Sequence, residues 1–377
     1  MRKARSIGSS EMEGRKESST REAAAVVAAV LRPEIRALSA YAVAQAEGMI
    51  KLDAMENPFT LPAAIRAKIA SVVADVPVNR YPDGGARGVK AALRSTLSLP
   101  DSVGLILGNG SDELIQIITS ALARPGATML APEPSFVMYR LNALYAGMRF
   151  VGVPLTPGFA LDRGAMREAI ERERPALVFI AYPNNPTGNL FDTAAIEDIL
   201  QRAPGLVVID EAYYAFADAS FLPRVGEFPN LVVLRTVSKI GMAGLRLGYA
   251  VGASAWTTEL DKLRQPYNLN ALTQAVAPLV LAEGGLLAEQ AATLKLERAR
   301  LHAALAAMPG VEPMRTQTNF VLARVPDAPR WFEGLLQAGI LVKNLHGSHP
   351  LLDHCLRITV GTPAENDALV AALKALR

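Results

Sequence analysis

In LVVLRTVSKIGMAGLR, residues 231–246, an apolar run is followed by a polar, glycine-rich turn. Four consecutive aliphatic residues predict a strand that is buried on both faces, as in a parallel sheet. Lys239 then lies just beyond the carboxyl end of a strand, at the edge where open α/β sheets bind ligands. Ser238 and Arg246 flank this lysine and could bind an anion beside its amine. The segment predicts a Schiff-base lysine next to a phosphate, with a solvated loop lysine as the alternative.

The same pattern continues outward from this segment. Between residues 103 and 251, short apolar runs alternate with helical stretches such as 111–123. This alternation predicts an α/β fold with a mostly parallel sheet and helices on both faces. The predicted strands are 105–107, 128–131, 150–153, 177–181, 206–209, 231–234 and 247–252.

Beyond Gln274 the alternation of short apolar runs and helical stretches ends. A long helical region rich in Ala and Leu is expected over 273–308, followed by alternating strands and a helix, which predicts a smaller α+β domain. The strands are expected at 319–323, 340–342 and 356–360, and the helix at 331–338.

This organisation predicts the domain boundaries. We expect a large domain over 59–272 and a small C-terminal domain over 273–377, with residues 23–58 as an N-terminal arm that packs with the small domain. Residues 1–22 are rich in Arg, Lys, Ser and Glu without periodicity, and we expect them to be disordered.

Composition narrows the functional class. Of the 377 residues, 50% are hydrophobic and 20% charged, which is typical of a globular enzyme. The net charge of +3 and the lack of a basic, aromatic-rich stripe give no support for nucleic-acid binding. We find no bilayer-spanning run and no signal peptide, because acidic residues precede the apolar run at 23–31. Cys355 is the single cysteine, which favours the reducing cytoplasm.

No metal site is expected. His346, His349 and His354 cluster loosely, but no acidic or cysteine ligand shares a spacing with them. A surface loop explains this cluster better than a zinc site does.

Polar side chains also follow other predicted strands, and the ends of parallel strands share one edge. Asp210 follows four aliphatic residues, and a buried carboxylate needs a partner such as a protonated pyridine nitrogen, although a helix cap would also explain it. Asn185 could donate to a phenolate oxygen, with Tyr213 as a second donor, or could simply form a turn. Phe136 could stack on a pyridine ring or belong to the core.

A second anion-binding element is expected at Gly110, Ser111 and Asp112, which open a predicted helix with free backbone N–H groups. Together with Ser238 and Arg246, they form a candidate phosphate site. A Schiff-base lysine, a carboxylate for a pyridine nitrogen and a phosphate site together indicate pyridoxal 5′-phosphate as cofactor.

The motifs resemble known families. NPTG at 185–188, DEAY at 210–213 and the segment 238–246 resemble the fold-type I pyridoxal-phosphate aminotransferases. More closely, the chain resembles the histidinol-phosphate aminotransferases from about Arg32 to its C-terminus. This resemblance rests on NRYPD at 79–83, GNGSDE at 108–113 and LRITVG at 356–361.

The resemblance implies roles at the cofactor. Lys239 is expected to form the Schiff base and to move the proton, while Asp210 pairs with the pyridine nitrogen. Asn185 and Tyr213 hold the phenolate oxygen. Tyr81 reaches the cofactor phosphate of the neighbouring subunit, which implies a homodimer. The phosphate is held within the subunit by Gly110, Ser111, Asp112, Ser238 and Arg246.

The resemblance also implies a substrate site. Arg357 is expected to bind the anionic end of the substrate and Tyr41 to close over it, with Asn57 and Lys343 as further contacts. The implied reaction converts L-histidinol phosphate and 2-oxoglutarate into imidazole acetol phosphate and L-glutamate, a step of L-histidine biosynthesis.

Two enzyme alternatives share most of these motifs, namely an aromatic-amino-acid aminotransferase and a threonine-phosphate decarboxylase. A third alternative is a regulator that keeps the fold as a ligand sensor. It is disfavoured because the catalytic set is complete and no helix-turn-helix precedes the domain.

The sequence departs from the family pattern at three places. The loop from Lys239 to Arg246 is one residue shorter than the common form. Met55 replaces an asparagine, and Lys343 stands where some members have a second anion-binding arginine. Lysine is a point charge rather than a bidentate fork, so this last change weakens the case for a phosphate-bearing substrate.

Overall fold

The computed structural model describes residues 20, 22–40 and 44–376 of the chain. It contains two compact units, residues 1–45 and 46–377, which are considered separately. The short helix α2 (Pro33–Arg36) belongs to the first unit. Most of the predicted disordered segment 1–22 lies outside the described residues, and so does Tyr41.

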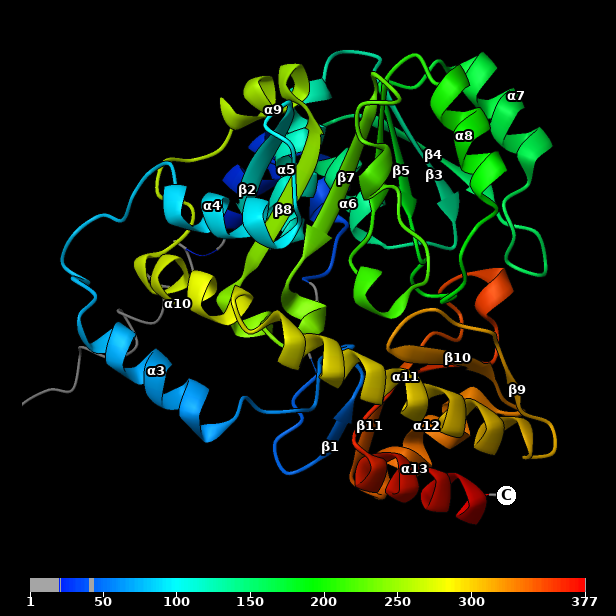
Figure 1. Cartoon of the computed structure of the whole chain (residues 1–377). Helices are drawn as coiled ribbons and strands as arrows, with labels where there is room; N and C mark the ends of the chain where they lie inside the picture. The colour runs from blue at the N-terminus through cyan, green and yellow to red at the C-terminus, as the bar shows by residue number, and fades with distance from the viewer. Residues whose placement is uncertain (1–19, 21, 41–43, 377) are drawn as a thin grey trace, which may run out of the picture. The chain divides into compact units, whose positions relative to one another are not determined.

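A seven-stranded sheet forms the centre of the second unit, in the order β2-β8-β7-β6-β5-β3-β4 (Figure 1). Its strands are β2 (Val103–Asn109), β3 (Thr128–Glu133), β4 (Arg149–Pro154), β5 (Leu177–Ala181), β6 (Leu206–Asp210), β7 (Leu231–Thr236) and β8 (Leu247–Ala253). The pairs from β7 to β4 are parallel, whereas β8 runs antiparallel to both of its neighbours. The prediction of a mostly parallel sheet is confirmed. β8 is reversed because residues 237–246 return the chain directly, without a crossover helix.

Helices cover both faces of this sheet, because successive strand residues point to opposite sides. On one face, residues such as Phe179 and Val208 pack in one apolar cluster with the helices α5, α6 and α9. On the other face, residues such as Ile180 and Val207 pack with α7 and α8, and α4 and α10 cover β2 and β8. The helix bounds are α4 (Arg87–Thr96), α5 (Ser111–Leu122), α6 (Met138–Tyr145), α7 (Arg163–Glu173), α8 (Thr193–Arg202), α9 (Ser254–Asp261) and α10 (Ala271–Leu281). The helix α3 (Ala63–Ala74) packs beside α10.

A second sheet of five strands has the order β1-β11-β12-β10-β9. Its strands are β1 (Ile50–Leu52), β9 (Glu312–Pro313), β10 (Phe320–Arg324), β11 (Ile340–Asn344) and β12 (Cys355–Thr359). β1 pairs in parallel with β11, and the other pairs are antiparallel. Figure 1 shows this sheet beside α11 (Gly284–Ala306), α12 (Ala328–Gln337) and α13 (Pro363–Ala375). The predicted strands of this region are present, whereas β1, β9 and α13 were not predicted. The domain boundaries remain predictions.

The helical region predicted over 273–308 is present and consists of two helices, α10 and α11. α10 and α11 meet at an angle of 78°, and α11 begins with two consecutive glycines, Gly284 and Gly285. Glycine has low helix propensity, which explains a break at this point. Within the described ranges, no single helix is long and apolar enough to cross a membrane. The bent pair of α10 and α11 has sufficient length and apolar composition only when the two helices are counted together.

Short 3-10 helices connect several elements. They are η1 (Tyr214–Phe216), η2 (Leu222–Arg224), η3 (Ser238–Ile240), η4 (Ala243–Leu245) and η5 (Pro350–Leu352).

Candidate active site

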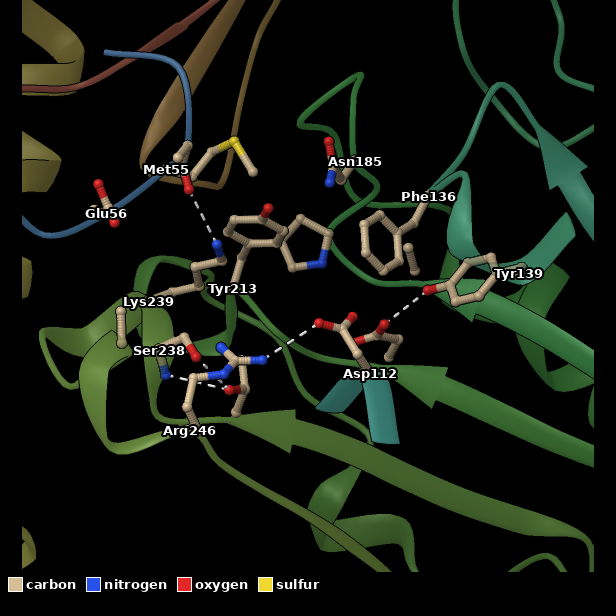
Figure 2. A pocket seen from close by; sticks show the side chains of 16 residues that line it. Met55, Glu56, Asp112, Phe136, Tyr139, Asn185, Tyr213, Ser238, Lys239 and Arg246 are labelled. Carbon is tan, nitrogen blue, oxygen red and sulfur yellow. Dashed lines mark hydrogen bonds and ion pairs between the residues drawn. The ribbon is translucent and has the colours of Figure 1, made fainter. Parts of the chain in front are cut away.

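One pocket gathers residues that lie at or beyond the carboxyl ends of β5, β6 and β7 (Figure 2). This is the edge at which parallel sheets bind ligands. Eight of the predicted site residues line it: Asp112, Phe136, Asn185, Asp210, Tyr213, Ser238, Lys239 and Arg246. Residues that were not predicted as site residues also line it, namely Ala54, Met55, Glu56, Tyr139, Ala181, Pro183, Thr236 and Ala243.

Lys239 points across the pocket toward the segment that contains Met55 (Figure 2). Its Nζ donates a hydrogen bond to the Ala54 carbonyl oxygen at 3.2 Å. Burial lowers the pKa of this amine to about 8, and the positive charge of Arg357 acts in the same direction. A lysine with such a pKa is partly neutral near neutral pH, and only the neutral amine can act as nucleophile or base.

Asp210 ends β6 and is 5% exposed. Its Oδ1 accepts from the Ala212 backbone N–H at 3.1 Å, and its Oδ2 accepts from the Tyr139 hydroxyl at 2.7 Å. Burial raises the pKa of the Asp210 carboxyl to about 6, although both hydrogen bonds favour the ionised form. A carboxylate in such a place gains most from a cationic partner, and a protonated pyridine nitrogen would be one.

Tyr139 is a site residue that sequence reasoning missed. The one signal was its position three residues after Phe136, close to the start of α6. A buried tyrosine in a helix is more simply interpreted as a core residue, and its hydroxyl partner lies 71 positions away in the sequence.

Arg246 also lines the pocket and forms an ion pair with Asp112, with Nη2 and Oδ2 3.5 Å apart. Gly110 precedes α5 with φ +82°, and a Cβ added there would lie 2.5 Å from Arg246 Nη2. A Cβ at this position would require the Arg246 guanidinium to shift, and the positive φ also disfavours residues other than glycine. Ser111 is the first residue of α5, so the backbone N–H groups of this turn lack partners within the helix.

The short loop after Lys239 reaches Arg246 by means of η3 and η4. Gly241, with φ +108°, separates the two turns, and Arg246 itself is left-handed with φ 48°. The Ser238 Oγ lies 2.9 Å from the Thr236 Oγ1, which fixes the hydroxyl beside the lysine. The missing loop residue is thus absorbed by backbone turns, and Arg246 still lines the pocket.

Arg357, on β12, lies next to Asn185. Its Nη1 donates to Asn185 Oδ1 at 2.6 Å, and its Nη2 donates to the Asp53 carbonyl at 3.0 Å. Because arginine can only donate, this bond orients the Asn185 oxygen toward Arg357 and leaves its NH₂ group as the donor. Lys343 is the register partner of Arg357 on the antiparallel strand β11, so the two side chains project from the same face.

Seven predicted site residues are not among those that line the pocket: Gly110, Ser111, Arg357 and Lys343, whose positions are given above, and Tyr81, Asn57 and Tyr41. Tyr81 is 81% exposed and stacks on Tyr267, with ring centroids 4.5 Å apart. Asn57 donates from Nδ2 to Gln290 Oε1 at 2.9 Å. Tyr41 lies outside the described residues. The catalytic and binding roles of all the site residues remain predictions.

The pocket fits pyridoxal 5′-phosphate in its donor set. An amine, a buried carboxylate and an anion-binding turn with an arginine match the aldehyde, the pyridine nitrogen and the phosphate of that molecule. Two structural features support this fit. Gly110 closely approaches Arg246, and Asp210 is a buried carboxylate that a cationic partner would stabilise.

Known proteins share this architecture. Residues 47–373 match the family described as aminotransferase class I and II. The chain is 54% identical over 345 residues to a histidinol-phosphate aminotransferase of Chromobacterium violaceum, covering 92% of this chain and 97% of that one. It is 51% identical over 354 residues to histidinol-phosphate aminotransferase 1 of Ralstonia nicotianae, covering 92% and 95%. The crystal structure of histidinol-phosphate aminotransferase from Sinorhizobium meliloti in complex with pyridoxal-5′-phosphate superposes with a TM-score of 0.82 at 26% identity, covering 92% and 97%.

Proposed function

The chain belongs to the class I and II aminotransferases, and from this premise we propose that it transfers an amino group between L-histidinol phosphate and 2-oxoglutarate with pyridoxal 5′-phosphate as cofactor. The products are imidazole acetol phosphate and L-glutamate, which places the reaction in L-histidine biosynthesis. The names of relatives near 50% identity support this substrate and do not favour the aromatic or decarboxylase alternatives. We also propose that the enzyme works in the cytoplasm. This compartment suits a biosynthetic enzyme, and its reducing conditions suit a chain with a single cysteine.

One observation carries the proposal: adjacent backbone carbonyls hold the reactive amine and the guanidinium that amino transfer with an anionic substrate requires. The Ala54 carbonyl accepts from Lys239, and the neighbouring Asp53 carbonyl accepts from Arg357. The reacting amine and the group that grips the anion are therefore fixed by the same short segment. A substrate bound at Arg357 is held close to the amine that must move its proton.

Each residue then has a chemical task. Bound pyridoxal phosphate supplies an electron sink that makes the α-hydrogen of the amino donor acidic. Lys239 carries the cofactor and moves the proton, for which its lowered pKa suits it. Asp210 keeps a proton on the pyridine nitrogen, and Asn185 and Tyr213 donate hydrogen bonds to the phenol oxygen.

The same anion site must serve two different substrates. Glutamate offers a carboxylate and histidinol phosphate offers a phosphate, and a guanidinium can pair with two oxygens of either group. Lys343 lies beside Arg357 in register and is proposed to add charge for the phosphate. The dual use of Arg357 is therefore the most specific consequence of the proposal.

Replacement of Arg357 by alanine is expected to lower kcat/KM for both histidinol phosphate and glutamate by on the order of 10²-fold, because a charge-assisted bidentate contact is lost. Lys343→Ala is expected to impair histidinol phosphate more than glutamate. The exposed Arg315→Ala is the matched control and should change neither value. Steady-state kinetics with each amino donor measures these effects.

The outcomes separate the candidate substrates. If Arg357→Ala impaired glutamate alone, the shared anion site would be wrong. A wild type that prefers phenylalanine or tyrosine as amino donor would make the aromatic aminotransferase the better assignment.

We propose that the active unit is a homodimer in which Tyr81 serves the cofactor phosphate of the other subunit. The exposed position of Tyr81, outside the pocket of its own chain, supports this proposal. Val78 is also exposed, at 78%, close by in the sequence. Aromatic and aliphatic side chains exposed together commonly belong to interfaces.

A mixed dimer tests this exchange. A Lys239→Ala chain has no reactive amine, and a Tyr81→Ala chain should have weakened cofactor binding. If Tyr81 acts across the interface, their heterodimer contains one intact site and should regain up to about half the wild-type activity. No regain above the parent chains would mean that Tyr81 acts within its own subunit, and an active monomer in sedimentation velocity would refute the dimer.

A further inference from the structure

We propose that Tyr139 is a positioning residue for the reaction, because its hydroxyl holds the Asp210 carboxylate in the orientation that receives the pyridine N–H. The inference rests on the proposed role of Asp210 and deepens it. Tyr139 lines the pocket, but its hydroxyl is directed at Asp210 rather than at the open space (Figure 2).

The position of the hydroxyl is fixed by the ring that bears it. Tyr139 is 1% exposed and stacks on Phe179 of β5, with centroids 4.5 Å apart and an interplanar angle of 6°. It also forms a T-shaped contact with Phe136, with centroids 5.6 Å apart at 85°. A ring held on two sides has little freedom, so the hydrogen bond to Asp210 needs no ordering when the cofactor binds.

The Asp210 carboxylate is held at both oxygens. Ala212 N–H binds Oδ1 and the Tyr139 hydroxyl binds Oδ2, while an ionised carboxylate has about four acceptor sites. Acceptor capacity therefore remains for a pyridine N–H. Because the two donors lie on the protein side, the carboxylate cannot rotate without breaking one of them.

Tyr139 also favours the ionised form of Asp210 in a place where burial disfavours it. The hydrogen bond lowers the pKa of Asp210, whereas the negative charges of Asp112 and Glu211 raise it. Burial and the nearby Asp210 charge raise the pKa of Tyr139 itself well above its usual range, so the phenol stays a donor. Lys239, Asp112 and Arg246, the other charged groups that line the pocket beside Glu56, are unchanged in all the variants compared below.

The test is a double-mutant cycle on the affinity of the cofactor-free protein for pyridoxal phosphate, measured by equilibrium titration. Tyr139→Phe keeps both ring contacts and removes only the hydroxyl. It is expected to weaken binding about tenfold, as for the loss of a hydrogen bond to a charged group. In an Asp210→Asn background the same change should have no further effect.

Two more variants complete the experiment. Tyr182→Phe removes another buried tyrosine hydroxyl, on a ring packed against Phe221 outside the pocket, and should leave affinity unchanged. Phe179→Leu loosens the Tyr139 ring while keeping its hydroxyl and should give an intermediate loss. The acid limb of the affinity profile should also move to higher pH in Tyr139→Phe, because the pKa of Asp210 rises when a donor to its carboxylate is lost.

The outcomes distinguish this inference from the proposed function. Wild-type affinity in Tyr139→Phe, or an equal loss in both Asp210 backgrounds, would overturn the role of Tyr139. If Asp210→Asn itself changed neither affinity nor turnover, the proposed role of Asp210 would fail, and the inference with it. A loss that is confined to the Asp210 background, with Tyr182→Phe unaffected, supports the positioning role.

Discussion

Replacement of Lys239 by alanine is expected to abolish multiple turnovers, by at least about 10⁴-fold, while the protein still binds pyridoxal phosphate non-covalently. The expectation combines the loss of covalent attachment with the loss of the proton-transferring amine, which alone contributes about 10²–10⁴ in typical enzymes. Asp210, Arg246 and Asn185 remain to hold the cofactor, so binding should weaken without disappearing. Steady-state turnover and equilibrium dialysis measure the two effects.

Borohydride reduction of the wild type identifies the attached lysine directly. The modified peptide should contain Lys239, the lysine that lines the pocket in the part of the chain that the structure describes. Lys262→Ala is the control, because this exposed lysine pairs with Glu259 on the surface. Attachment of the cofactor to a different lysine would show the assignment of Lys239 to be incorrect.

The second large effect is expected for Asp210→Asn. The variant should keep the fold, because asparagine has nearly the same shape: its one oxygen can accept from the Ala212 N–H, and its NH₂ group can donate to the Tyr139 hydroxyl oxygen. Proton abstraction from the amino donor should slow by about 10²–10⁴-fold, since an electrostatic contribution of several kcal/mol is lost from the transition state. Single-turnover absorbance changes with saturating glutamate isolate this step.

Asp112→Asn is the informative comparison for Asp210. Asp112 also lines the pocket, but it pairs with Arg246 at the phosphate end. Its loss should affect cofactor affinity more than the rate of proton abstraction. Near-normal proton abstraction in Asp210→Asn would contradict the pairing of this carboxylate with the pyridine nitrogen.

The central strands, and the polar residues that follow them, could be predicted from the sequence. Runs such as Leu231–Leu234 are too apolar for an exposed strand and too short for a helix, so they predict central parallel strands. The residues after such runs then meet at one edge by geometry alone. Asn185, Asp210 and Lys239 are therefore expected in one pocket on local pattern alone, and all three line it.

Local patterns could not show which distant polar groups meet. The Met55 N–H donates to Thr359 Oγ1 and the Met55 carbonyl accepts from Asn319, which pins the segment that reaches Lys239. Glu211, which follows β6, and Arg235, near the end of β7, are buried and form an ion pair at 2.8 Å. Neither arrangement leaves a periodic signal, because each joins residues that are far apart in the sequence.

The α/β class, the strand-end residues and the family follow from the amino-acid sequence, because hydrophobic periodicity and short motifs are local properties of the chain. The folded arrangement was needed to see that Tyr139 holds Asp210, that Arg357 meets Asn185, and that Tyr81 lies outside the pocket of its own chain. These facts depend on how side chains from separate elements pack and orient, and packing is a property of the whole fold.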